Sequence, residues 1–349
     1  MKKKILIFFI KCKKIAIRII NLLKIHKAVN ADTYYPELKQ KSKIKKYIEN
    51  FLWTLKYAEI NTFYYLYGFD IDNFKDKSNY ISNYEFMHDR NEMNGIYNEY
   101  SHVVLLRDKL IFEKYLNSNG IKTAKTIAII IDGKIMDVKF NKLDDINKIF
   151  ENTVFIKNSN GECADGVFCI KDKKQFESEK KKFEKGVFII QEKLQQHDEM
   201  NRINPKSVNT IRIVTINNNN KITVLASGLR VGTKKSKNVD NWAAGGLYVE
   251  IEDDGKLTKY GFAKPKYGGK TDIHPDSNIK FKEFSIPEYK RVIELVTKAH
   301  KTLYGIHSIG WDVAITNEGP ALIEGNDNWE ISLMQVNHGL KKQWKSLLK

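Results

Sequence analysis

Apolar and polar residues follow different patterns on the two sides of residue 125. Before it, apolar positions recur at helical spacing, which predicts a mostly helical stretch over 43–67 and a helix over 107–120 that ends at Gly120. After it, runs such as TIAIII, TVFIK, TIRIVTI and ITVLASGLRVG have the length and composition of strands. The sequence therefore predicts an α+β protein with a mostly antiparallel sheet after residue 190.

Short turn sequences divide the predicted strands into hairpins. DGK lies between TIAIII and KIMDVKF, NNNN follows TIRIVTI, and DDGK lies inside GLYVEIEDDGKLTKYGFA. Helices are expected between the strands: an acidic segment before TVFIK, a Lys-rich one before GVFIIQEKL, and residues 286–305 near the end of the chain.

The first 27 residues form a strongly basic stretch. They contain nine Lys or Arg and no acidic residue, and the apolar run 5–10 is broken by Lys11. A secretory signal needs about 7–15 uninterrupted apolar residues and a membrane-spanning helix about 20, so neither is expected. The stretch predicts a basic amphipathic helix. Two interpretations stay open: it lies on an anionic membrane surface, or it packs on the protein with its lysines in water.

The amino-acid composition limits the kinds of partner and the compartment that we expect, but it does not identify a function. The 349 residues carry 59 Lys and Arg against 42 acidic residues, a formal charge of +17 that indicates anionic partners. No nucleic-acid recognition motif accompanies this charge, so nucleic acid is not an expected partner. Cys12, Cys163 and Cys169 have neither C-x-x-C nor zinc spacing, and such a sparse set is typical of the cytoplasm. We therefore expect a cytoplasmic protein, peripheral on the inner face of the membrane if the basic helix binds there.

Two acidic residues lie inside strand-like runs near the end of the chain. The stretch IGWDVAITNEGPALIEGN, residues 309–326, predicts a hairpin with a five-residue turn at 316–320. Pairing outward from this turn sets Asp312 opposite Glu324, and Asn326, two residues further on, points to the same face. Opposed carboxylates repel each other, but they are good oxygen ligands for Mg²⁺. The alternatives are a register shifted by one residue, or one acid paired with a lysine while the other faces solvent.

Several stretches, in matching order and spacing, resemble the ATP-grasp superfamily and, within it, the sugar-transfer-associated family. They are RDKLIFEKYLNSNGIKTAKT (107–126), VFIKNSNGECADGV (154–167), FIIQEKLQQHDEMNRINPKSVNTIRIVTI (188–216), NWAAGGLYVEI (241–251), HPDS (274–277) and DVAITNEGPALIEGN (312–326). The resemblance covers about residues 60–345. It implies an ATP-grasp fold whose two α+β subdomains clasp ATP: a small nucleotide-lid subdomain at 101–190 and a large subdomain with the magnesium site at 191–349. A basic, mainly helical region at 1–100 precedes them.

The resemblance also implies cofactors and catalytic residues. ATP and Mg²⁺ are the implied cofactors, with the metal on Asp312, Glu324 and Asn326. Arg212 and Arg230 are expected to face the triphosphate or a reacting acyl phosphate as catalytic residues. Arginine suits this task because its planar fork donates two hydrogen bonds to one phosphate or carboxylate.

The implied nucleotide-binding residues divide by the part of ATP that they contact. Lys109 and Lys157 match the lysines that contact the phosphates, where an ammonium acts as a point charge. The others are Gln191, Glu192 and Leu194 for adenine, Asp198 for the ribose hydroxyls with Glu199 as the alternative, and Asn209 and Asn241 lining the same cavity. The loop after Lys157 departs from the usual glycine-rich form, because it carries Glu162 and Asp165.

The implied activity is that of an ATP-dependent carboxylate–amine ligase acting through an acyl phosphate. The family points to surface polysaccharide biosynthesis, with a carboxylate and an amine on small-molecule or glycan substrates, one of them a sugar acid or an amino acid. Two alternatives are a kinase of a sugar hydroxyl on the same fold, and a non-catalytic protein that binds membrane or glycan.

Overall fold

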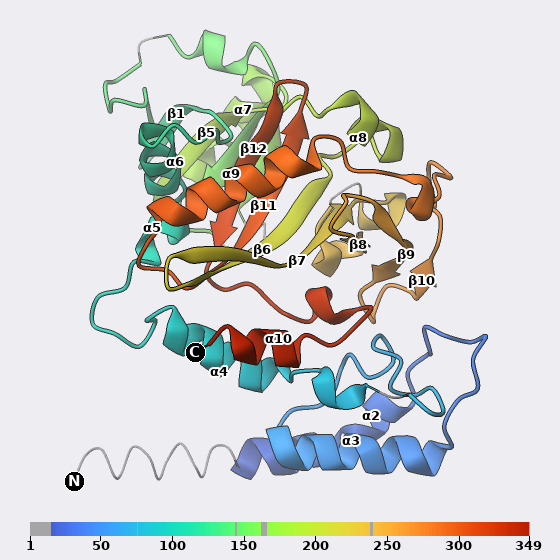
Figure 1. The fold of residues 1–349 in the computed structure, drawn as a ribbon. Helices are drawn as coiled ribbons and strands as arrows, with labels where there is room; N and C mark the ends of the chain where they lie inside the picture. Colours follow the sequence, from blue (N-terminus) through green and yellow to red (C-terminus); the bar gives the residue numbers. More distant parts are fainter. Residues whose placement is uncertain (1–14, 75, 144, 162–165, 238–239, 349) are drawn as a thin grey trace.

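The computed structural model of the protein describes residues 15–74, 76–143, 145–161, 166–237 and 240–348. Its strands form a five-stranded sheet of order β2-β1-β5-β3-β4 and a seven-stranded sheet of order β10-β9-β8-β7-β6-β11-β12 (Figure 1). The pairings between neighbouring named strands are antiparallel. The predicted α+β class and the antiparallel sheet after residue 190 are therefore confirmed.

The elements have the following bounds. The helices are α2 (Ile25–Val29), α3 (Lys43–Tyr57), α4 (Asn83–Met93), α5 (Val104–Arg107), α6 (Lys109–Ser118), α7 (Lys173–Glu179), α8 (Asp198–Ile203), α9 (Tyr289–Thr302) and α10 (Lys341–Ser346), and residues 15–23 are also helical. The strands are β1 (Thr126–Ile131), β2 (Lys134–Met136), β3 (Val154–Asn158), β4 (Val167–Ile170), β5 (Val187–Glu192), β6 (Thr210–Asn218), β7 (Lys221–Val231), β8 (Leu247–Ile251), β9 (Leu257–Ala263), β10 (Lys270–Thr271), β11 (Ser308–Thr316) and β12 (Gly319–Asn326).

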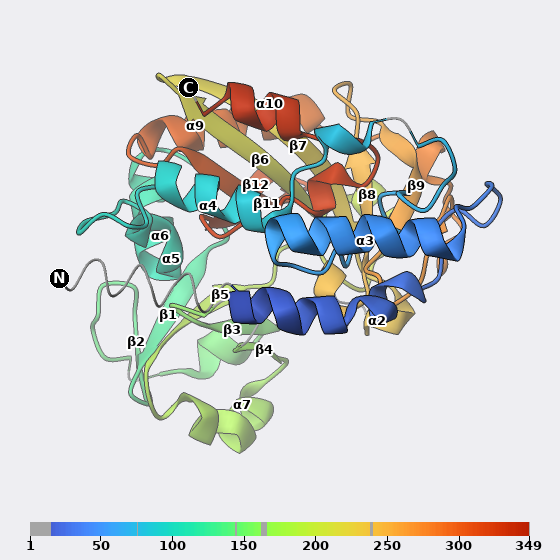
Figure 2. The same cartoon turned by 90° about the horizontal axis from the view of Figure 1, so that it is seen from below.

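The seven-stranded sheet is buried on both faces. Along β6, Ile211 and Ile213 belong to the core shared with α9, whereas Val214 and Ile216 belong to a second core on the opposite face. This second core contains the aromatic residues of the N-terminal region and of the chain's last segment. Helix α9 accordingly covers one face of the sheet, while α3, α4 and α10 lie on the other (Figures 1 and 2).

The N-terminal region is less helical than its apolar pattern predicts. Helix α3 begins at Lys43 as expected but ends at Tyr57, where Ala58 adopts a left-handed conformation with φ 59°. The prediction of helix up to residue 67 is therefore wrong. Residues 62–70 fold as turns instead, because the aromatic side chains of Tyr64, Tyr67 and Phe69 pack into a compact cluster rather than along a helix stripe.

The basic stretch at 1–27 lies partly outside the described residues, which begin at 15. From there the chain is helical at 15–23 and again in α2. No helix in the described ranges is long and apolar enough to cross a membrane. Of the three cysteines, Cys169 is an exposed free thiol, and Cys12 and Cys163 lie outside the described residues.

The predicted hairpins are present, with shorter elements at two places. The NNNN turn joins β6 to β7 through Asn219 and Asn220, whose φ values of 52° and 66° suit the tight turn of a twisted hairpin. In contrast, KIMDVKF contributes only the three residues of β2, and the acidic helix-like segment forms a single 3₁₀ turn, Asn147–Phe150.

Candidate active site

The acidic hairpin β11–β12 has the pairing predicted at its centre but reaches it differently. Its turn has two residues rather than five, with Thr316 paired to Gly319, so the partners near the turn differ from those expected. A β-bulge between Asp312 and Val313 then adds one residue on β12 and brings Asp312 opposite Glu324. The predicted juxtaposition of two carboxylates is therefore confirmed, and the predicted turn is wrong.

Two arginines on neighbouring strands hold the carboxylate of Asp312. Arg212 of β6 is the register partner of Asp312, with its Nε 2.9 Å from Oδ1 and its Nη2 donating to Oδ2 at 3.1 Å. Arg230 of β7 donates from Nη1 to Oδ1 at 3.2 Å. The three side chains are 9–15% exposed. Arg212, Asp312 and Glu324 thus form a row across β6, β11 and β12.

A second carboxylate supports this arginine pair. Asp240 lies 3.9 Å from Nη2 of Arg230 and accepts a hydrogen bond from the hydroxyl of Thr210. Burial lowers the pKa of Arg230, but Asp312, Asp240 and Glu324 outweigh it and hold that pKa above its ordinary value. The guanidinium is therefore a fixed positive charge on the floor of the site.

Lys109 is positioned by the start of helix α6. Asp108 caps this helix by accepting the backbone N–H groups of Leu110 and Ile111 at 2.9 Å, and its other oxygen accepts the Ser159 hydroxyl at 2.6 Å. The Lys109 ammonium donates to the carbonyl of Gly161 at 2.5 Å and lies 3.5 Å from Oε1 of Glu324. The side chain therefore joins the β3–β4 loop to the acidic hairpin.

Lys157 approaches the same place from strand β3. Burial lowers the pKa of the Lys157 ammonium. After burial, the charge of Glu324 raises this pKa, that of Lys109 lowers it, and that of Asp312 raises it. The two lysines predicted to bind phosphate are therefore close enough to the acidic hairpin to interact with its carboxylates. Together with the two arginines, four cations surround the two carboxylates, an arrangement that suits a polyanion.

The three predicted metal ligands are chemically suited to Mg²⁺. Two carboxylates, Asp312 and Glu324, and the amide of Asn326 offer the oxygen donors that Mg²⁺ prefers. The Asn326 Nδ2 atom is buried and has no hydrogen-bond partner in the described part of the chain, so this side chain has no evident structural bond to maintain there. Within the described residues no group of three or more His, Cys, Asp or Glu side chains is placed to hold a metal, so the predicted site has only two carboxylates and the Asn326 amide.

The side chains of the residues predicted to contact adenine and ribose do not point into one common site. The Gln191 side chain is buried, and its amide donates a hydrogen bond to the buried carboxylate of Glu113 at 3.3 Å. Glu192 is exposed and paired with Lys125 at 2.8 Å. Leu194 is half-buried in the segment after β5. Any adenine contact in this segment would therefore come from its backbone or from Leu194.

Three further predicted residues have local structural contacts. Asp198 is exposed at the start of α8, where its backbone N–H donates to Asn317 at 3.3 Å. Asn209 is fully buried, and its amide donates to the carbonyls of Met200 and Asn204 at 2.9 and 3.0 Å. Asn241 caps the 3₁₀ turn Trp242–Ala244. The side chains of Asn209 and Asn241 thus bond nearby backbone, and within the described residues no hydrogen bond or ion pair joins these three side chains to the cation cluster.

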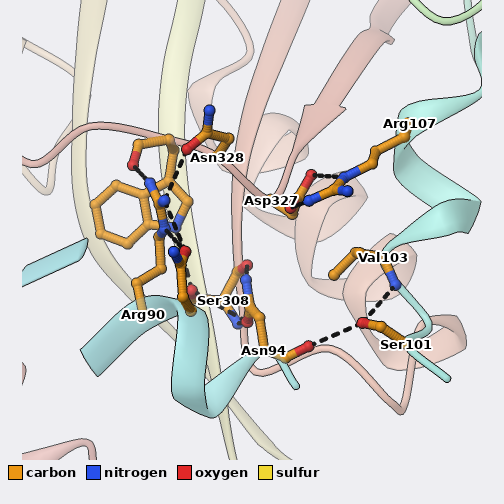
Figure 3. Close-up of polar contacts among 10 residues, drawn as sticks. Arg90, Asn94, Ser101, Val103, Arg107, Ser308, Asp327 and Asn328 are labelled. Atoms are coloured by element: carbon orange, nitrogen blue, oxygen red, sulfur yellow. Dashed lines mark hydrogen bonds and ion pairs between the residues drawn. The ribbon is translucent and has the colours of Figure 1, made fainter. Parts of the chain in front are cut away.

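Other residues important for the site's geometry escaped the sequence analysis. Asp240 carries no sequence signal, whereas Asp108 does, because an acid directly before a helical pattern is a standard N-cap. Arg107 forms a two-point ion pair with Asp327, the residue directly after β12, at 3.1 and 2.7 Å (Figure 3). Arg90 bonds the next residue, Asn328, at 2.7 Å. These contacts fix the end of β12 to α4 and α5.

A separate cavity lies beside residues 330–332, a few residues after this anchored segment. It has a volume of about 430 Å³ and is lined by residues of the N-terminal region, by the loop after β9 and by residues 330–332. Aromatic side chains (Trp53, Phe63, Tyr67) and polar ones (Asn61, Ser332) form its wall. None of the predicted site residues lines it.

Comparison with known proteins identifies the family. The model of the sugar-transfer associated ATP-grasp family matches residues 88–348. The chain belongs to that family. The ATP-grasp fold expected from the sequence is thereby confirmed, and ATP and Mg²⁺ are the cofactors that go with it. No curated protein is significantly similar to the chain in sequence.

Solved structures with a similar fold include several ligases. The L-amino acid ligase from Bacillus licheniformis is 14% identical with a TM-score of 0.43, over 71% of this chain and 49% of that one. The N5-carboxyaminoimidazole synthetase from Staphylococcus aureus, complexed with ADP, has the same identity and score, over 70% and 52%. The D-alanine–D-alanine ligase from Helicobacter pylori is 16% identical with a TM-score of 0.42, over 70% and 58%. This chain thus spans only about half to three fifths of their length.

Proposed function

We propose that the protein is an ADP-forming carboxylate–amine ligase that acts in surface polysaccharide biosynthesis. The observation that carries this proposal is the cluster at β6, β7, β11 and β12, where Lys109, Lys157, Arg212 and Arg230 surround Asp312 and Glu324. A site with more cations than acids, and with oxygen donors for Mg²⁺, suits a triphosphate and a second anion beside it.

The proposed reaction has two steps. An oxygen of the acceptor carboxylate attacks the γ-phosphorus of ATP, the bond to ADP breaks, and an acyl phosphate forms. An amine nitrogen then attacks the acyl carbon, phosphate leaves with the bonding electrons, and the nitrogen loses its proton to give an amide. Neither step requires a nucleophile from the protein.

The residues of the chain act by charge and position. Asp312, Glu324 and Asn326 would hold Mg²⁺, which when bound neutralises phosphate oxygens. Arg212 and Arg230 donate paired hydrogen bonds to the transferring phosphoryl group or to the acceptor carboxylate, and Lys109 and Lys157 balance charge on the leaving phosphates. Arg212 and Arg230 bond Asp312 in the structure, so they would exchange part of this contact for the phosphoryl group when ATP and Mg²⁺ bind.

The cavity between the N-terminal region and residues 330–332 supports a sugar-containing acceptor. Its aromatic walls offer faces for the C–H surface of a sugar ring. Its polar and charged lining residues, among them Asn61, Lys264 and Glu330, offer hydrogen bonds for hydroxyl groups. Residues 330–332 lie four to six residues beyond Asn326, the last residue of β12.

A kinase acting on a sugar hydroxyl is the second candidate, because the same cation cluster suits phosphoryl transfer to either oxygen nucleophile. The test is a product assay with the full chain, ATP, Mg²⁺, and panels of sugar acids and amines. A ligase releases free phosphate and ADP only when a carboxylate and an amine are both present. Phosphate retained on the acceptor, with no need for an amine, would replace the ligase with the kinase.

A further inference from the structure

Helix α3 exposes its apolar side and buries its polar side. The exposed large apolar residues are Ile44, Tyr47, Ile48, Phe51, Leu52 and Leu55, with exposures from 40% for Phe51 to 74% for Ile44. Their spacing of three and four residues places them in one stripe along the helix. The residues of α3 that are buried are Asn50 and Thr54. A helix packed on its own protein has the opposite arrangement, so this stripe is built to be covered by something else.

The helical segment 15–23 extends the stripe into a broader face. It runs beside α3 in both ribbon views, and the Asn21 amide donates to the carbonyl of Ala58 at 2.9 Å, next to the end of α3 (Figures 1 and 2). Five of its large apolar residues are at least 41% exposed: Ile15, Ile17, Ile19, Ile20 and Leu23. We call the exposed apolar residues of 15–23 and α3 together the apolar face.

The exposed charged residues of 15–24 and α3 themselves have one sign, and one of them, Lys45, lies 3.8 Å from Asp72 outside these helices. Lys24, Lys43, Lys45 and Lys56 are exposed on the two helices. The only acid in 15–29 or α3 is Glu49, which is engaged elsewhere by Lys41, Lys77 and the Tyr64 hydroxyl at 3.0, 2.8 and 2.6 Å. A surface that is apolar along its middle and cationic at its edges matches the interface of an anionic lipid bilayer.

We propose that the apolar face docks the protein on an anionic membrane, with α3 and residues 15–23 lying in the plane of the interface. The same charges disfavour the other occupants. A second copy would bring cations against cations, and so would residues 1–14, which contain six lysines and no acid. This docking goes beyond the basic stretch at 1–27, because most of the face belongs to α3. It does not depend on the ligase activity.

The test is co-sedimentation of the full chain with vesicles. Wild type should bind vesicles of phosphatidylglycerol and phosphatidylcholine in equal parts, bind phosphatidylcholine alone far less, and lose binding as salt rises. The affinity of the double variant Ile48→Glu with Leu52→Glu for these vesicles should fall about tenfold or more, because two apolar side chains no longer enter the lipid. Ile44→Glu with Leu55→Glu, at the two ends of the stripe, should repeat the loss.

A matched control and two opposing results complete the test. Tyr100→Glu places the same charge at an apolar residue that is 85% exposed outside the face, and should bind as wild type does. ATP binding by each variant, measured in the same samples, reports that the chain is folded. Failure of wild type to bind anionic vesicles would overturn the proposal. So would α3 variants that keep full vesicle binding but abolish a dimer seen by sedimentation, which would assign the face to a second copy.

Discussion

Replacing Asp312 by asparagine should destabilise the protein, whatever its activity. The carboxylate is the shared partner of Arg212 and Arg230, at 2.9 and 3.2 Å, and both arginine side chains are at most 15% exposed. The variant keeps the shape of the side chain but leaves two buried guanidinium groups without this counter-charge. Removing one partner of a buried ion pair costs about 3–5 kcal/mol. Glu324 and Asp240 remain near the arginines, so we expect the lower end, about 3 kcal/mol.

The assay is urea unfolding followed by tryptophan fluorescence, since the neighbouring Trp311 is fully buried in the core. Asp254→Asn is the matched control: its carboxylate also pairs with a cation, Lys256 at 2.7 Å, but both side chains are more than half exposed. We expect no measurable change in stability there. ATP without Mg²⁺ should stabilise Asp312→Asn more than wild type, because its phosphates replace the lost charge. Equal stabilities for wild type and Asp312→Asn would refute a buried arginine clamp on this residue.

Three further predictions concern single residues. Burial raises the pKa of Glu59 to about 7, so its contribution to stability is fully present below its unfolded pKa of about 4.5 and is lost as pH rises through 7. The free energy of unfolding of the wild type should therefore be higher at pH 5 than at pH 7 by about 2 kcal/mol more than that of Glu59→Gln. The same dependence of unfolding free energy on pH in both proteins would contradict this. Lys109→Met should weaken ATP binding about tenfold in calorimetry, whereas Lys122→Met, which removes an exposed ion pair with Glu318, should not. Arg230→Lys keeps the charge but loses the two-point fork, so product formation should fall more than ATP affinity does, and equal losses would refute a role in transfer.

The acidic hairpin illustrates what the sequence could and could not predict. The opposition of Asp312 and Glu324 followed from counting residues along two strands. The count succeeded although a tighter turn had moved the register by one residue, because the bulge beside Asp312 moved it back. A bulge depends on packing against neighbouring strands, and no single-sequence pattern marks it.

Other errors came from residues whose partners lie far away in the chain. The apolar pattern after Tyr57 suggested more helix, but those aromatic residues pack against the seven-stranded sheet and the chain's last segment. The amphipathic pattern of α3 was visible in the sequence. Its reversed orientation was not, because periodicity locates an apolar stripe without telling what covers it.

The most direct test of the magnesium–ATP site is isothermal titration of ATP, with and without Mg²⁺, on wild type and Glu324→Gln. This variant is a cleaner probe than any change at Asp312, because the ion pair that Glu324 forms, with Lys109 at 3.5 Å, is long and partly exposed. We expect wild type to bind ATP much more tightly with Mg²⁺, and Glu324→Gln to lose most of that difference while keeping its metal-free affinity. A wild type that binds ATP equally well without Mg²⁺, or a variant with an unchanged response to the metal, would contradict the assignment of the acidic hairpin as the metal site.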